Sequence, residues 1–120
     1  MTTITREIQV EADTFRSIQQ EIRQNHATRQ RLSQQKTENE LVLAELQGAS
    51  EESTIYKLIG PALVKQESVE AISNVKKRLE FIGKELDKLD GGLESLQTKA
   101  DKARKNIERL QKKQEDEQHE

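Results

Sequence analysis

The sequence contains no cysteine, no tryptophan and a single proline, and only three of its 120 residues are aromatic. Without cysteine the chain can form no disulfide bond, has no thiolate nucleophile and cannot bind zinc through sulfur. This absence is compatible with a reducing compartment. Disulfide-stabilised scaffolds and cysteine-dependent enzymes are therefore excluded as classes of protein.

Hydrophobic residues are also scarce. They make up 32% of the chain, against 35% charged residues, and the mean hydropathy is −0.94. A chain this polar cannot build a compact globular core. It is either disordered or, if its apolar residues recur regularly, it forms long helices and coiled coils, so the periodicity decides between the two.

Long hydrophobic runs and a strong net charge are missing too. No stretch approaches the length of a membrane span, and the first residues, MTTITREIQVEAD, lack the basic start and apolar run of a secretory signal. The net charge of −2 gives no general attraction to nucleic acid or to acidic membranes. We therefore expect a cytoplasmic protein that binds neither nucleic acid nor membrane.

Apolar residues recur in the first arm at alternating spacings of three and four, which predicts a coiled-coil helix over 4–48. Gly48 suits the position just past a helix end. Polar residues interrupt the seam from Asn25 to Asn39; they either tune partner choice or are simply tolerated. The seam positions are Ile4, Ile8, Glu11, Phe15, Ile18, Ile22, Asn25, Arg29, Leu32, Lys36, Asn39, Leu43 and Leu46.

The second arm carries the strongest pattern, with an apolar residue at every seam position. Ser68 can cap a helix that has Glu70 in its first turn, so we predict a second coiled-coil helix over 68–115 and a frayed tail over 116–120. The seam positions are Ile72, Val75, Leu79, Ile82, Leu86, Leu89, Leu93, Leu96, Ala100, Ala103, Ile107 and Leu110.

The sequence Asp90-Gly91-Gly92 interrupts this arm. Asp-Gly is a turn signal, and each glycine costs a helix about 1 kcal/mol relative to alanine. Leu89 and Leu93 nevertheless keep the seam in phase across the glycines, so we expect a continuous but softened helix. In an antiparallel pairing Asn25 and His26 would lie opposite, which predicts a flexible point in the middle of the arms.

Between the arms, residues 54–66 read TIYKLIGPALVKQ, the one stretch where apolar residues cluster without helical spacing. Gly60-Pro61 suits a tight turn of undecided type, which predicts a β-hairpin. A lone hairpin is marginal in water, and the chain has no other strands to cover it, so we expect it to pair with other chains. One face would carry Ile55, Ile59, Ala62 and Val64, and the other Tyr56, Leu58 and Leu63. The predicted fold is mainly α, a long antiparallel coiled-coil hairpin whose two helices are joined by this single β-hairpin.

Residues with catalytic or metal-binding patterns are not found. His26 and His119 have no ligand-spaced neighbours, and phosphate-binding loops and nucleophile motifs are absent. We therefore expect no enzymatic activity, no metal and no cofactor.

The chain ends offer two features that bear on function. Ile4, Ile8, Val10, Ile107 and Leu110 would meet where opposed helices end; each is either an ordinary seam residue or part of an apolar patch for a partner. Cations outnumber acidic residues in the same region. The helix dipole favours cations near a helix C-terminus, so this excess does not require a role in nucleic-acid binding. These cations are Lys99, Lys102, Arg104, Lys105, Arg109, Lys112 and Lys113.

The order of arm, single β-hairpin and arm, in about 120 residues without cysteine, resembles the β-class subunits of prefoldin. The resemblance is most specific in YKLIGPALVKQ, and KRLEFIGKEL and TENELVLAEL also match. Within that class these motifs are most similar to one eukaryotic member. The similarity covers nearly the whole chain.

The resemblance implies a hexamer of two α-class and four β-class subunits, in which hairpins form a platform of two β-barrels and six coiled-coil tentacles extend from it. Such a complex captures unfolded polypeptides, notably nascent actin and tubulin, without ATP and passes them to the cytosolic chaperonin. Strand contacts would fall to Ile55, Tyr56, Leu58, Ile59, Leu63 and Val64, with Gly60-Pro61 as the turn. Client capture at the tip would fall to Ile4, Ile8, Ile107 and Leu110.

Two other functions remain open. The chain could be a coiled-coil tether or scaffold that is not a chaperone, with the hairpin as a mere connector. It could also grip RNA through the basic face between Lys99 and Lys113, although the net charge argues against this.

Overall fold

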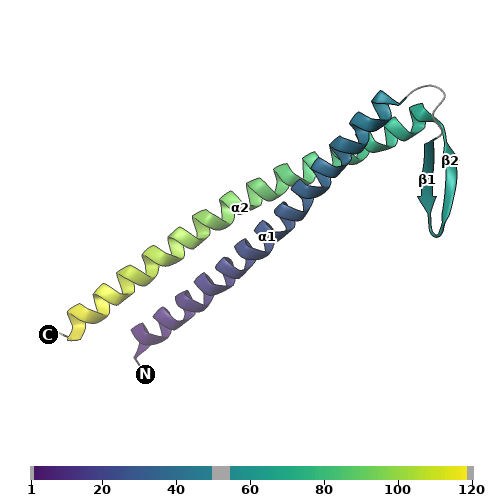
Figure 1. Cartoon of the computed structure of the whole chain (residues 1–120). Coiled ribbons are helices and arrows are strands. Elements are labelled where there is room, and N and C mark those ends of the chain that lie inside the picture. The colour runs from purple at the N-terminus through teal and green to yellow at the C-terminus, as the bar shows by residue number, and fades with distance from the viewer. Residues whose placement is uncertain (1, 50–54, 119–120) are drawn as a thin grey trace. The chain divides into compact units, whose positions relative to one another are not determined.

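The computed structural model describes residues 2–49 and 55–118, with the backbone alone at positions 57, 64 and 66. It contains two long helices joined by one β-hairpin: α1 (Thr3–Gly48), β1 (Ile55–Ile59), β2 (Ala62–Gln66) and α2 (Ser68–Gln118) (Figure 1). The predicted fold class is confirmed. Residue 54, the first of the predicted hairpin stretch, and the linker residues 50–53 lie outside the described residues.

Helix α1 begins at Thr3 because Thr2 caps it. The Thr2 hydroxyl oxygen accepts a hydrogen bond from the backbone N–H of Thr5 at 3.1 Å, which satisfies one of the amide groups that a helix start leaves unpaired. The helix ends at Gly48, the residue that the sequence predicted as its end.

Helix α2 is continuous from Ser68 to Gln118, through Gly91 and Gly92. The predicted continuity across the glycines is therefore confirmed. The helix extends through residues 116–118, where the sequence predicted the start of a frayed tail. Glutamate and glutamine favour helices, and no glycine or proline stops the chain there. Residues 119 and 120, including His119, lie outside the described residues. None of the helices in the described part combines the length and apolarity needed to cross a bilayer.

The chain divides into two compact units, and each helix contributes to both. We call residues 1–28 and 88–120 the terminal unit, and residues 29–87 the hairpin unit. The division falls after Thr28 in α1 and after Asp87 in α2, close to the glycines at which the sequence predicts a flexible point.

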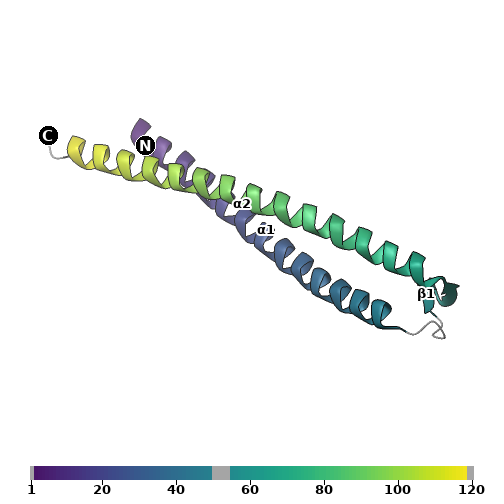
Figure 2. The same ribbon diagram turned by 90° about the horizontal axis from the view of Figure 1, so that it is seen from above.

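In the terminal unit, the first part of α1 and the last part of α2 run antiparallel, with the start of α1 beside the end of α2 (Figure 2). The Gln114 side chain donates a hydrogen bond from Nε2 to the hydroxyl of Thr5 at 3.0 Å, across a sequence separation of 109 residues. The buried side chains of this unit are Ile4, Leu96, Ala100, Ala103 and Leu110.

In the hairpin unit, the rest of α1 lies along the first part of α2. Ala71, Val75, Ile82 and Leu86 are its buried side chains, and all four lie on α2. The α1 side contributes half-buried residues such as Leu43 and Leu46. Ala71 lies one residue before the predicted start of the seam and is buried because its spacing to Val75 places it on the same face.

The predicted seams match the observed burial closely. All twelve seam residues of α2 are buried or half-buried, and so are the seam residues of α1 except Lys36, which is exposed. Lysine at a seam position can carry its ammonium group to water along its flexible stem. The alternation of three and four therefore identifies the inward faces of both helices.

Strands β1 and β2 pair antiparallel, with Ile55 opposite Gln66 and Ile59 opposite Ala62. Gly60 has a φ of +59°, and the proline that follows must have a negative φ. This combination is that of a type II′ turn, whose twist suits a two-residue hairpin. Because cross-strand partners share a face, Ile59 lies with Ala62 while Leu58 lies with Leu63, as predicted.

Candidate functional site

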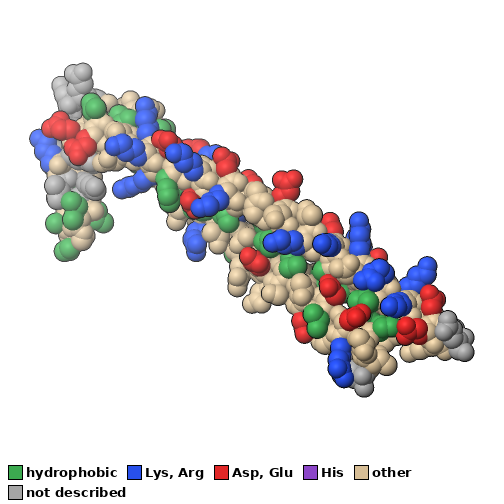
Figure 3. Space-filling view, turned by 180° about the vertical axis from the view of Figure 1, so that it is seen from behind, with side chains coloured by type: hydrophobic (Ala, Val, Ile, Leu, Met, Phe, Trp, Pro, Cys, Tyr) green, Lys and Arg blue, Asp and Glu red, His purple; other side chains and the backbone are tan. Residues whose placement is uncertain are grey.

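The hairpin exposes large hydrophobic side chains to solvent. Leu58 is 68% exposed and its cross-strand partner Leu63 is 67% exposed, while Tyr56 and Ile59 on the same strand are also more than half exposed. Figure 3 shows hydrophobic side chains gathered on the end of the hairpin. Fully burying one such side chain contributes about 1.5–3 kcal/mol. The hairpin thus offers a large favourable free energy to any partner that covers it.

The backbone of the hairpin offers a second kind of interaction. The sheet of the described residues has two strands, so each strand has one edge whose N–H and C=O groups make no ladder hydrogen bonds. An exposed edge with apolar side chains is a template for pairing with another strand. Side-chain and backbone chemistry therefore both suit addition of strands from other chains.

The root of the hairpin is held by the helices of the same unit. Ile55 is half-buried, beside a groove of about 300 Å³ that α1 and α2 line with apolar side chains. The lining residues are Val42, Leu46, Ile55, Tyr56, Leu58, Ala71, Asn74, Val75 and Arg78. The side chains of Leu58 and Leu63 remain mostly exposed, and so do Gly60 and Pro61 at the turn. The side chain of Val64, which the sequence places in the assembly set, lies outside the described side chains.

The four residues predicted for client capture come together in the terminal unit, but mainly as core. Ile4 and Leu110 are 8% and 4% exposed, and Ile8 and Ile107 are half-buried. The exposed hydrophobic residue nearby is Val10, at 62%. It lines an open groove of about 540 Å³ together with Thr3, Arg6, Glu7, Glu11, Arg109, Leu110 and Lys113.

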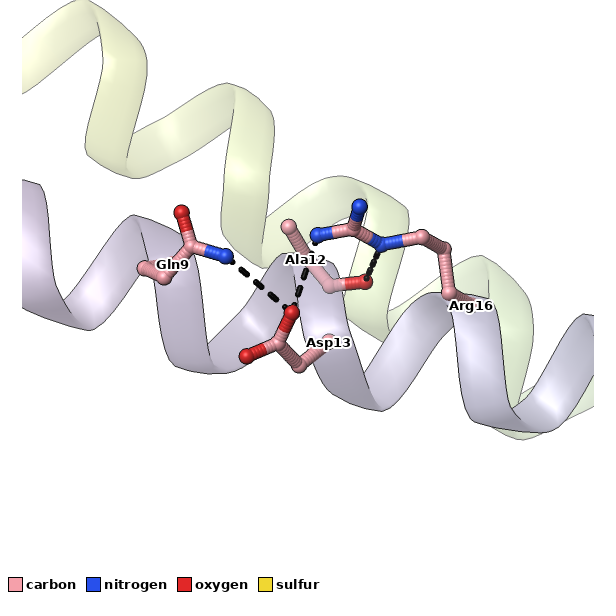
Figure 4. A network of polar contacts seen from close by, with 4 residues as sticks. All are labelled: Gln9, Ala12, Asp13 and Arg16. Atoms are coloured by element: carbon pink, nitrogen blue, oxygen red, sulfur yellow. Dashed lines mark hydrogen bonds and ion pairs between the residues drawn. The ribbon is translucent and has the colours of Figure 1, made fainter.

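Three exposed ion pairs, Arg16–Asp13, Lys84–Glu80 and Arg104–Glu108, each join residues three or four apart on one helix. Figure 4 shows Asp13, whose Oδ1 accepts hydrogen bonds from Gln9 Nε2 at 3.1 Å and from Arg16 Nη2 at 2.9 Å. Arg104 pairs with Glu108 at 3.3 Å in the same way. Both signs of charge are interspersed over the visible face (Figure 3). Such exposed local pairs are typical of solvated helix faces and contribute little to stability.

Metal-binding and buried ionic chemistry are not found in the described residues. They contain no group of three or more histidine, cysteine or acidic side chains placed to hold a metal ion. Nor do they bury any polar or charged side chain. His26 is exposed.

Four exposed hydrophobic residues of the helices were missed by the sequence analysis. They are Leu41, Val42, Val69 and Phe81, between 44% and 81% exposed. All four lie off the predicted seams. An apolar residue at a position that the helix turns toward water could have identified them in the sequence.

A family profile described as "Prefoldin subunit" matches residues 9–114. "Prefoldin subunit 6" of Arabidopsis thaliana is 42% identical over 110 residues, covering 92% of this chain and 85% of that protein. "Prefoldin subunit 6" of Homo sapiens is 33% identical over 108 residues, covering 90% of this chain and 84% of that protein. These relatives bear the name of the eukaryotic member, subunit six, that the hairpin motifs indicate.

Among solved structures, the fold is similar to the prefoldin beta subunit from Thermococcus strain KS-1, with a TM-score of 0.79 and 22% identity. The match covers 89% of this chain and 94% of that chain. The prefoldin beta2 subunit from the same source matches with a TM-score of 0.67 and 24% identity, covering 77% of this chain and 98% of that chain.

Proposed function

The chain belongs to the prefoldin subunit family, and from this premise we propose that it acts in a hexameric co-chaperone that captures unfolded polypeptides without ATP. It joins α-class and other β-class prefoldin subunits through its hairpin. The complex holds clients such as nascent actin and tubulin and transfers them to the cytosolic chaperonin in the cytoplasm. The chain itself contributes no catalytic group.

The observation that carries the proposal is the exposed apolar hairpin, for which the described residues supply no third strand. Tyr56, Leu58, Ile59 and Leu63 are all more than half exposed, and both strand edges are available. Gly60 supplies the positive φ of +59° that the tight turn requires. Hairpins from several subunits would supply the missing strands, with Ile55 and Val64 also in strand contacts, and would bury these side chains in a shared β-structure.

Client capture falls to the apolar residues at the chain ends. Val10 is accessible without any rearrangement. Ile4, Ile8, Ile107 and Leu110 pack between the helix ends, so they reach a client when the last turns of the pair separate, which costs least at helix ends because terminal contacts are fewest. Each contact is weak, and the several tentacles of the complex add avidity.

A reconstitution experiment tests the proposal. We expect this chain, mixed with its partner subunits, to form a complex of hexamer mass by analytical ultracentrifugation. This complex should suppress aggregation of chemically denatured actin in the absence of nucleotide. A complex that forms but leaves actin aggregation unchanged would instead indicate a structural tether, and no complex at all would remove the assembly proposal.

A further inference from the structure

Phe81 is the exposed aromatic side chain of α2. It is 62% exposed, whereas its neighbour Ile82 is 5% exposed in the core of the hairpin unit. Exposing a large aromatic ring forfeits a favourable burial free energy. A single exposed apolar side chain is common on protein surfaces, so a binding role for this ring depends on the groove beside it.

Phe81 lines an open groove between α1 and α2, wholly within the hairpin unit. The groove has a volume of about 570 Å³, and its lining is Leu32, Gln35, Asn39, Lys77, Arg78, Phe81 and Ile82. Leu32, Phe81 and Ile82 give it an apolar floor. It lies about 20 Å along α2 from Ser68, by the helical rise, so it is separate from the exposed turn of the hairpin. It also shares no residue with the Val10 groove of the terminal unit.

The polar rim of the groove is cationic. In the described part of the structure, Lys77 and Arg78 make neither an ion pair nor a side-chain hydrogen bond. The acidic neighbour Glu80 is instead paired with Lys84 at 3.3 Å. The Asn39 side chain donates one hydrogen bond from Nδ2 to the Gln35 carbonyl at 2.7 Å. The rim therefore offers unused positive charge beside an apolar floor.

We propose that this groove, which we call the Phe81 groove, binds a short acidic segment of a partner protein. The segment places one apolar side chain against Phe81 and its carboxylates against Lys77 and Arg78. Opposite charge at the rim selects the segment and speeds its association, while the apolar anchor supplies affinity.

Other occupants fit the observations less well. A nucleic acid requires an extended basic track. The groove supplies only two cations, Lys77 and Arg78, and the nearby Lys84 is already paired with Glu80. The acidic end of this chain, from Gln114 to Glu120, contains no apolar residue to serve as an anchor. A partner segment that combines an apolar anchor with carboxylates matches both the apolar floor and the cationic rim of the groove.

The test uses the assembled complex and fluorescent peptides. The probe carries one phenylalanine flanked by glutamates; a second peptide replaces the glutamates with lysines, and a third replaces the phenylalanine with serine. We expect the first peptide alone to bind well by fluorescence anisotropy. Phe81→Ser and Lys77→Glu should each weaken its binding by roughly tenfold, and salt should weaken it further.

A matched control lies one residue away. Lys76 is exposed and is not part of the Phe81 groove, so Lys76→Glu makes the same change in charge and should leave peptide binding within about twofold of the parent, as a screened surface charge does. Arg78 is left intact because it also lines the groove at the hairpin root. Equal losses for Lys76→Glu and Lys77→Glu, or equal binding of the acidic and basic peptides, would overturn the proposal.

Self-association is separated by a second measurement. If sedimentation shows complexes pairing with each other and Phe81→Ser abolishes this pairing, the groove is a contact between copies and the acidic-segment proposal is wrong. Aggregation suppression by the complex should be the same with Lys77→Glu as without it, so loss of peptide binding can be distinguished from loss of the chaperone activity.

Discussion

The two units of the chain differ in how much apolar surface they leave uncovered. Of the nine large hydrophobic side chains that are exposed among the described residues, eight belong to the hairpin unit and one, Val10, to the terminal unit. Both units use the same two helices and the same seam spacing. Four of these eight side chains lie on the hairpin strands and four on the helices, so the hairpin and the helix surface of its unit together leave apolar area that a partner could bury.

This contrast predicts different kinds of partner for the two units. Large exposed patches suit stable association, in which burial is permanent. A unit whose apolar residues are mostly covered suits weak, reversible contacts at its ends.

Charging the hairpin should abolish assembly. The double variant Leu58→Asp and Leu63→Asp places two carboxylates directly opposite each other on the exposed face, where a partner would have to bury them unpaired. We expect the variant to remain outside the complex in sedimentation experiments.

The matched change in the other unit is Val10→Asp, at a comparably exposed aliphatic residue. It should enter the complex normally. Assembly of the hairpin variant, or exclusion of the Val10 variant, would contradict the contrast between the units.

Adjacent residues of α2 should differ sharply in their effect on stability. Ile82→Ala removes a core side chain that is 5% exposed, and we expect a loss of about 2–4 kcal/mol in the free energy of unfolding. Phe81→Ala removes a ring that is 62% exposed and should cost less than about 0.5 kcal/mol. Urea unfolding of both variants measures the difference, and equal costs would show that Phe81 belongs to the core.

A substitution on the exposed surface of the terminal unit should weaken client capture. Among the described residues of this unit, Val10 is the one exposed large hydrophobic side chain. We therefore expect Val10→Asp to lower aggregation suppression by a few-fold, as one of several weak contacts is lost. Val10→Ile is the control, because it keeps an apolar side chain and should preserve capture. Unchanged suppression with Val10→Asp would place capture elsewhere.

The sequence predicted the inward faces well because burial imposes a strict periodicity on a helix pair. Apolar residues at every seam position from Ile72 to Leu110 are explained by a helix that buries one face in a coiled coil. The off-seam residues could not be interpreted in the same way. Phe81 lies one residue before the seam position Ile82 and so off the inward face, but the spacing alone does not show that its ring borders a groove beside α1.

The ends of elements and the capture residues were harder to predict, for a related reason. Polarity suggested fraying after residue 115, but Glu115 and its neighbours are compatible with a helix, and no local signal ends it before Gln118. Ile4 and Leu110 looked available at the chain ends, yet each packs against the opposite helix. Sequence spacing places such residues at the end of the helix pair, but it does not show how closely the two helices pack there.

The smallest expected effect concerns the glycines near the division between the two units. A Cβ at Gly91 or at Gly92 would meet nothing within 4 Å, and neither has a positive φ. Packing therefore does not require glycine at either position. Replacing both by alanine should raise the free energy of unfolding by roughly 0.5–1 kcal/mol per site, because alanine restricts the unfolded chain.

Hydrogen exchange distinguishes a local effect from a general one. We expect slower amide exchange near residues 89–93 in the double variant Gly91→Ala and Gly92→Ala, because the softened segment opens less often. Gly83→Ala is the matched control: it lies on the same helix, also with free space for a Cβ, but inside the hairpin unit. It should give a similar gain in stability with unchanged exchange at 89–93. If exchange in the parent is no faster at 89–93 than at 79–86, the glycines do not soften the helix, and the two units are not separated by a flexible point.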